Sequence, residues 1–245
     1  MSGIAIEIAV QDVAGVRTAL ASGADRIELC AALGVGGLTP SIGLVEAAVA
    51  AAAGARASDF VHVLVRPRGG GFLYDEDELS VIARDIRAAF SAGADGVVVG
   101  ASTSAGELDH RAIARFVEAA DGMSVTVHRA IDIAPDPVAA VAALADVGIA
   151  RVLSSGGALD CRAGAGVLAE MVAAAAGVQI MAGGGVRIAD IALLAATGVD
   201  AVHLSARGRT THGGVSGPGG GDAGFDVTDA EVVRAAIAAA RVAGR

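Results

Sequence analysis

Short apolar runs alternate with longer amphipathic segments along almost the whole chain. The runs lack strict polar and apolar alternation, which is typical of parallel strands covered by helices. They predict strands at residues 4–10, 26–30, 60–66, 96–100, 124–129, 151–155, 178–182 and 201–205. The segments that follow them predict helices at residues 13–21, 43–53, 76–92, 109–120, 137–147, 164–176, 188–196 and 229–242.

This repeated strand and helix unit predicts a (β/α)₈ TIM barrel, an α/β fold. The 245 residues suit one such barrel, and no linker divides them, so we expect residues 1–245 to form a single domain. An open doubly wound sheet is the structural alternative, although the first strand-to-helix turn lacks its GxGxxG motif. The glycine-rich stretch 207–226 has no apolar periodicity and is expected to be a mobile loop, either a lid or a disordered segment.

The composition excludes several classes of function. A net charge of -9 argues against nucleic-acid binding, and the absence of lysine excludes Schiff-base chemistry through that residue. Two cysteines give neither a disulfide framework nor a CxxC metal site. Because we find no signal segment and no long uncharged apolar run, we expect a cytoplasmic protein with no membrane partner.

The candidate chemistry lies at the carboxyl ends of the strands, where TIM barrels place their active sites. Period-2 alternation points a set of polar side chains into the barrel: Glu7, Glu28, Cys30, His62, Arg66, Thr126, His128, His203 and Ser205. Glu7 or Glu28 would act as a general base, and His128 as an acid or polarising group. The structural alternatives are a Glu7–Arg66 pair inside the barrel and histidines that only fill the core.

Arginines and glycines at the same end predict a binding site for a small anion. Two arginines flank a proline in the sequence RPRGGG, and three glycines follow the seventh strand in MAGGGVR. Barrels commonly bind phosphate at the loops after strands seven and eight. The expected ligand-binding residues are Arg66, Arg68, Arg129, Gly183, Gly184, Ser205 and Arg207. Solvated or tight turns are the alternative explanation.

A metal site is the third possibility. Thiolate ligands select Cu(I), and imidazole suits zinc or copper. Cys30 and the histidines at 62, 128 and 203 could converge in the barrel, but no local spacing such as HExxH supports this. Cys161, the second cysteine, would then be a small buried hydrophobe.

Several motifs in order along the chain resemble the copper homeostasis protein CutC family. They are ADRIELC, GGLTPS, VRPRGGGFLYDEDEL, GADGVVVG, VTVHRAID, RVLSSGG, MAGGGV and HLSAR. The resemblance implies a TIM barrel, a cytoplasmic location, a homodimer or higher assembly, and copper-ion binding in copper homeostasis.

Carried over by position, the resemblance makes Cys30 the copper thiolate at the end of the second strand. The family's partner thiol lies two residues after the first-strand glutamate, and here that position is Ala9. A Cu(I) site would therefore need a histidine, such as His203 or His128, or a second chain. The polar residues that match the family, among them Asp132 as a further expected ligand-binding residue, suit an isomerase or lyase that acts on a small anionic substrate, such as a phosphorylated compound.

Overall fold

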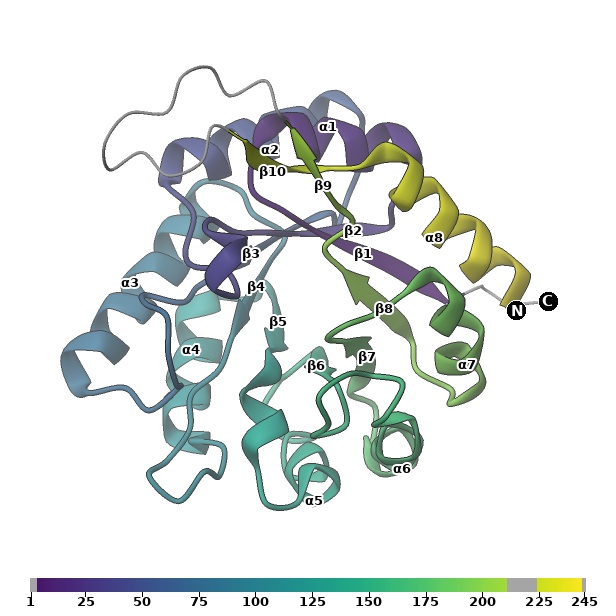
Figure 1. Cartoon of the computed structure of the whole chain (residues 1–245). Coiled ribbons are helices and arrows are strands. Elements are labelled where there is room, and N and C mark those ends of the chain that lie inside the picture. Colours follow the sequence, from purple (N-terminus) through teal and green to yellow (C-terminus); the bar gives the residue numbers. More distant parts are fainter. Residues whose placement is uncertain (1–3, 211–223, 244–245) are drawn as a thin grey trace.

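A computed structural model describes residues 4–210 and 224–243, and it confirms the TIM barrel. Parallel strands close on themselves in sequence order, with the last strand of the ring paired to the first (Figure 1). The barrel strands are β1 (Ala5–Val10), β2 (Arg26–Leu29), β3 (Val61–Leu64), β4 (Gly96–Val99), β5 (Ser124–Val127), β6 (Arg151–Ser154), β7 (Gln179–Gly183) and β8 (Ala201–Leu204).

Helices surround the barrel on the outside (Figure 1). They are α1 (Val13–Ser22), α2 (Ile42–Gly54), α3 (Glu76–Ser91), α4 (His110–Ala120), α5 (Pro137–Ala142), α6 (Ala165–Ala174), α7 (Ile191–Ala196) and α8 (Ala230–Ala243). Short 3₁₀ turns η1 (Leu33–Val35), η2 (Arg129–Ile133) and η3 (Ile188–Asp190) lie at strand ends or before a helix. None of the described helices is long and apolar enough to cross a membrane.

Side-chain caps define where several helices begin. Asp12 accepts a hydrogen bond from the Gly15 amide at the start of α1, and Asp75 forms a reciprocal capping box with Glu78 at the start of α3. The predicted helix at 137–147 ends earlier, since α5 stops at Ala142 and the chain continues in turns.

The buried part of the protein has two regions: the core between the strands and the helices, and the inside of the barrel. Outward-facing Ile6, Ile8 and Ile27 belong to the main apolar core, which also contains buried helix residues such as Ile86. Inside the barrel, small apolar clusters around Leu64 and around Met181 lie beside buried charged residues. A barrel interior is ordinarily filled with branched apolar side chains, so these charges point to chemistry.

The prediction of a mobile loop at residues 207–226 is wrong at both ends of this stretch, where the structure has strands. Arg207–Thr210 forms β9, which pairs antiparallel with β10 (Phe225–Thr228). A residue far away in the sequence also supports this pairing. The Gln11 side chain donates a hydrogen bond to the Asp226 carbonyl oxygen at 3.0 Å. Residues 211–223 lie outside the described part of the chain, and the expectation for them stays untested.

Glycine is required where the His62 ring packs against β4. A Cβ atom on Gly96 would overlap that ring and come within 2.7 Å of the Ser124 carbonyl oxygen. We therefore expect Gly96→Ala to lower the free energy of unfolding by about 1–3 kcal/mol, as overpacked cores do. Urea unfolding measures this.

Gly166 provides the matched control. It lies in α6, and nothing in the structure comes within 4 Å of a Cβ added there. Gly166→Ala should raise stability by about 0.5–1 kcal/mol, because alanine favours the helix. Equal effects of the two substitutions would contradict the packing argument.

Candidate functional site

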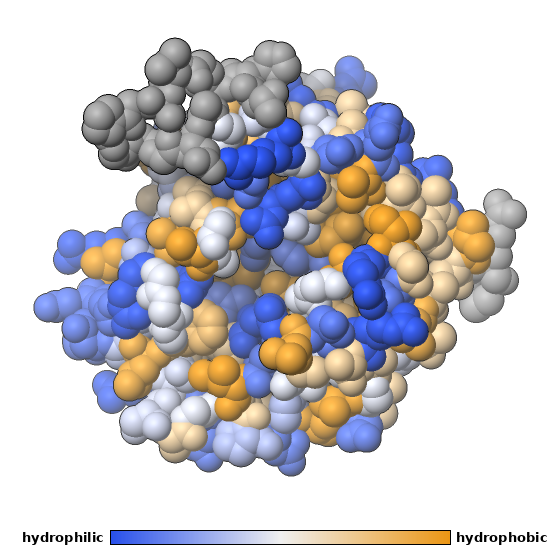
Figure 2. All heavy atoms as spheres, viewed as in Figure 1, coloured by the Kyte–Doolittle hydropathy of each residue, from blue (hydrophilic) through white to orange (hydrophobic). Residues whose placement is uncertain are grey.

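A cavity of about 450 Å³ opens at the carboxyl ends of the strands. Figure 2 shows a hollow near the middle of the face in view, with strongly hydrophilic side chains around it. The polar residues that line the cavity come from several strand ends and the loops beyond them: Glu28, Arg66, His128, Arg129, Gly184, Gly185, His203, Ser205 and Arg207.

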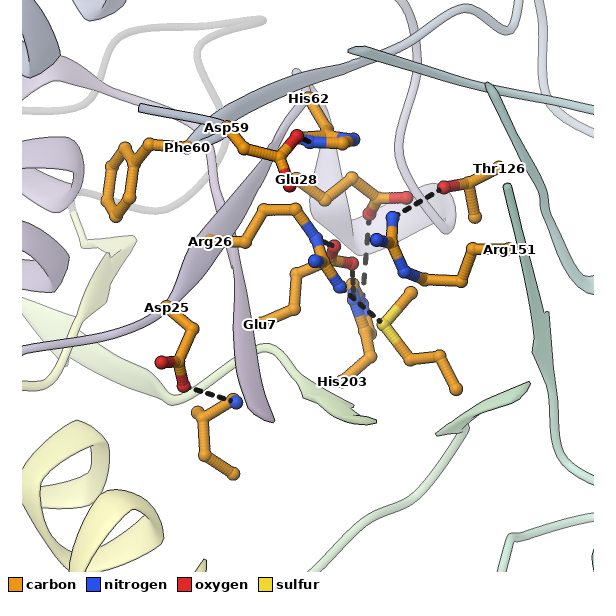
Figure 3. A network of polar contacts seen from close by, with 12 residues as sticks. Glu7, Asp25, Arg26, Glu28, Asp59, Phe60, His62, Thr126, Arg151 and His203 are labelled. Atoms are coloured by element: carbon orange, nitrogen blue, oxygen red, sulfur yellow. Dashed lines mark hydrogen bonds and ion pairs between the residues drawn. The ribbon is translucent and has the colours of Figure 1, made fainter. Parts of the chain in front are cut away.

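Glu7 lies below this cavity, fully buried at the centre of a charged network (Figure 3). Strand pairing places it beside Arg26 on β2 and His203 on β8, and its carboxylate forms ion pairs with both. Burial alone would raise the pKa of Glu7. The hydrogen bond from His203 and the charge of Arg26 outweigh that cost and hold the pKa well below its usual range.

Glu28 reaches the cavity from β2 and has a different environment. Burial, reinforced by the charge of Glu7, raises the pKa of Glu28 to about 6, although the cationic ring of His203 opposes the shift. His203 Nε2 lies 3.8 Å from Glu28 Oε2, while its Nδ1 lies 2.8 Å from Glu7 Oε1. Burial lowers the pKa of His203, but the two carboxylates raise it above its ordinary value overall.

His128 follows β5 and faces the cavity as a neutral ring. Its Nδ1 accepts a hydrogen bond from the Ala130 amide at 3.2 Å, so the proton of the neutral ring lies on Nε2. That Nε2 is buried and has no hydrogen-bond partner in the structure. Burial and the charge of Arg66 lower the pKa of His128 to about 3. The ring therefore presents an unused hydrogen-bond donor.

Arg66 forms one wall of the cavity. Its guanidinium donates to the carbonyl oxygens of Val35, Gly37 and Gly70, and it lies 5.3 Å from the centre of the Phe72 ring. Its Nε is buried without a partner. Within the described residues, Arg66 forms no ion pair with a carboxylate, so its charge favours an anion in the cavity.

Arg129 is held beyond the end of β5 by a network around Asp132. Asp132 accepts from Arg129 Nε at 2.8 Å, and Ser155 accepts from Arg129 Nη2 at 2.9 Å. Asp132 also accepts hydrogen bonds from the side chains of Ser154 and Ser155, so it supports the site without lining the cavity. Gly184 has a φ of 113°, a backbone conformation that other residues rarely adopt, which explains the glycine there.

Two predicted ligand-binding residues lie elsewhere. Arg68 points away from the cavity, forms an ion pair with Glu78 and stacks over the Tyr74 ring. Gly183 is also outside the lining, because the Leu153 side chain fills the space where its Cβ would be. Ser205 and Arg207 do line the cavity, and Arg207 contacts Asp226 at 3.2 Å.

Cys30 does not fit a Cu(I) site of two thiolates. Its thiol is fully buried, packs with Leu64 and Val98, and donates to the Val10 carbonyl at 3.5 Å. Burial, together with the charge of Glu28, raises the pKa of this thiol and opposes formation of the thiolate. Within residues 4–210 and 224–243, no three histidine, cysteine, aspartate or glutamate residues form a group able to hold a metal ion.

Two buried arginines of the network were missed by the sequence reasoning. Arg26 pairs with Glu7, and Arg151 donates to Thr126 (Figure 3). Arg151 also donates to the Gln179 side chain. Alternation could have found Arg26, since it lies two residues before Glu28 and shares its face of β2.

Fold and site together define a class: a (β/α)₈ barrel with ionisable side chains gathered at the carboxyl ends of its strands. The sequence profile of the CutC family matches residues 4–208. A relative from Agrobacterium fabrum, named as a family protein CutC, is 44% identical over 205 residues, which are 82% of this chain and 78% of the relative. The chain belongs to the CutC family.

Solved structures agree with this assignment. The structure of a CutC protein from Streptococcus agalactiae, whose name refers to copper homeostasis, has a TM-score of 0.77 at 30% identity and covers 82% of this chain and 98% of that one. A thiamine phosphate pyrophosphorylase from Pyrococcus furiosus has a TM-score of 0.62 at 14% identity, with coverage of 98% and 96%, and shares the fold alone.

The ionisation of Glu28 predicts a pH-dependent effect on stability. Because its pKa is raised from 4.5 to about 6, the folded protein keeps a proton that the unfolded chain has already released. This stabilisation is complete below pH 4.5 and is lost as the pH rises through 6. The free energy of unfolding of Glu28→Gln, relative to that of the native protein, should therefore increase by about 2 kcal/mol from pH 4 to pH 8.

Chemical unfolding of both proteins across this range measures the difference. Glu118→Gln, on the exposed face of α4, reports the effect of removing one negative charge from an acidic surface. If Glu28→Gln follows the control at every pH, Glu28 is not in the environment described.

Proposed function

We propose that the chain is an enzyme that transfers a proton within a small anionic substrate bound at the barrel mouth, in an isomerase or lyase type of reaction. One observation carries the proposal: the cavity contains both a carboxylate, Glu28, and a neutral imidazole, His128, with a buried donor that none of the described protein groups uses. A base beside a polarising donor is the minimum that proton transfer next to a carbonyl needs.

The environments of these groups support separate roles. Glu28 has a pKa of about 6 and can accept a proton near neutral pH, as a general base should. His128 stays neutral at that pH, so its Nε2–H would hydrogen-bond a substrate oxygen and stabilise the charge that develops there. Glu7 is a weaker candidate than Glu28 for the base, because it is ion-paired below the cavity.

The arginines support an anionic substrate. Arg66, Arg129 and Arg207 line the cavity, and the backbone at Gly184 and Gly185 joins them there. Guanidinium groups bind carboxylate and phosphate through paired hydrogen bonds, so either group on the substrate is suitable. A cytoplasmic location and a homodimer remain predictions for the chain.

The decisive experiment for turnover follows exchange of carbon-bound hydrogen. The protein is incubated in D₂O with phosphorylated and carboxylated hydroxy-carbonyl compounds, and proton NMR detects deuterium incorporation. We expect exchange with at least one compound and its loss by more than about a hundredfold in Glu28→Gln, which lacks the base. Exchange that persists in Glu28→Gln and in His128→Ala would refute the assignment of both residues.

Anion binding is tested separately by calorimetry with 2-phosphoglycolate. Arg129→Gln should weaken binding at least about tenfold, because a charge-assisted hydrogen bond to the anion is lost. Arg68→Gln removes the same charge outside the cavity and should have little effect. Equal losses in the two variants would mean that the probe responds only to overall charge.

Copper binding is the second candidate, favoured by the name of the Streptococcus agalactiae protein. It requires the Cys30 thiolate, and Ala9 offers no second thiol in this chain. A Cu(I) titration against a competing chelator, on the native protein and on Cys30→Ser, decides the matter. We expect no tight stoichiometric binding by either protein, since the thiol is buried with a raised pKa. Tight binding that Cys30→Ser abolishes would establish the copper function.

A further inference from the structure

His203 lies between two carboxylates of unequal exposure to the cavity. Its Nδ1 is 2.8 Å from Glu7 Oε1, and its Nε2 is 3.8 Å from Glu28 Oε2. Glu7 has no exposed surface, while Glu28 and His203 both line the cavity. Figure 3 shows the ring directed between the two acids.

The closure of the barrel fixes the positions of Glu7, His203 and Glu28 relative to one another. Glu7 is the direct neighbour of His203 across β1 and β8, and of Arg26 across β1 and β2. Glu28 lies two residues after Arg26 on β2, opposite Ala9. The ring is therefore anchored by its Nδ1 from below, and its Nε2 can approach Glu28 or a ligand above.

The balance of buried charge explains why the contact between Glu7 and His203 affects the ionisation of Glu28. Two buried carboxylates repel each other, and the second would stay protonated unless a cation lies beside it. Arg26 contacts Glu7 and the Met181 sulfur and forms no ion pair with Glu28. Among the described ion pairs, the only one that Glu28 forms is with His203. Among the described residues, the other ionisable groups inside the barrel or in the cavity lining are Cys30, His62, Arg66, His128, Arg129, Arg151 and Arg207.

We infer that His203, clamped by Glu7, is a positioning residue that keeps Glu28 ionised and ready to accept a proton. The inference rests on the proposed function, because it assigns His203 to the proton-transfer site and not to a metal. Glu7 acts through His203: its carboxylate fixes the ring orientation and stabilises the imidazolium. No proton needs to move along the pair for this role.

The test measures ionisation directly and needs no substrate. Carbon-13 NMR follows the side-chain carboxyl carbons of labelled glutamate through a pH titration, and Glu28→Gln assigns the Glu28 signal. In His203→Asn the amide can still donate to Glu7, but the positive charge is gone. We expect the Glu28 midpoint to rise by about one pH unit or more in this variant.

His128→Asn is the matched control. It removes an imidazole from the same cavity, but one that is neutral, so the Glu28 midpoint should stay within a few tenths of a unit. A shift of the same size in both variants would overturn the inference, as would no shift in His203→Asn.

Glu7→Gln provides a second measurement in case His203→Asn fails to fold. Glutamine keeps an acceptor for Nδ1–H and the volume of the side chain, but it removes the charge that stabilises the imidazolium. Histidine NMR should then show that the His203 midpoint falls by about one pH unit or more. An unchanged midpoint would mean that Glu7 is not the anchor. Failure of deuterium exchange with every substrate would refute the proposed function while leaving these titrations intact.

Discussion

The site depends on the closure of the barrel around a single buried charge. Glu7 can remain ionised without solvent only because β1 pairs with β2 on one side and with β8 on the other. These pairings bring Arg26 and His203 to the same carboxylate, although His203 lies 196 positions further along the chain. An open sheet would separate β8 from β1 and leave Glu7 without its imidazole partner, at a cost of several kcal/mol.

The fold tolerates these buried charges because the two faces of the barrel strands have different roles. Apolar residues that face the helices form one continuous core, and they provide the burial that stabilises the barrel. The interior can then hold charged groups, because each is paired or hydrogen-bonded: Arg151, for example, donates to Thr126 and Gln179. Among the buried polar side-chain atoms that lack a partner in the described residues, Arg66 Nε and His128 Nε2 belong to residues that line the cavity.

Periodicity predicted the barrel and most of the inward-facing residues, because both depend on local alternation that the sequence displays. It could not predict that Arg68 would leave the site, since its partner Glu78 lies in the first turn of α3, where it also closes the capping box of Asp75. The β9 and β10 pairing was missed for a related reason. Arg207–Thr210 has little strand propensity, and its pairing depends on contacts with distant residues such as Gln11.

The two imidazoles at the mouth show how one cavity can hold the same side chain in two opposite electrostatic environments. Strand β5 lies across the barrel from β1, so His128 and the Glu7–His203 pair come from opposite walls. The two carboxylates that flank His203 raise its pKa, whereas burial and the charge of Arg66 lower the pKa of His128 to about 3. A substrate between them would meet a base held by a cation on one side and a neutral donor on the other. The proposed proton transfer across a small anion relies on this polarity.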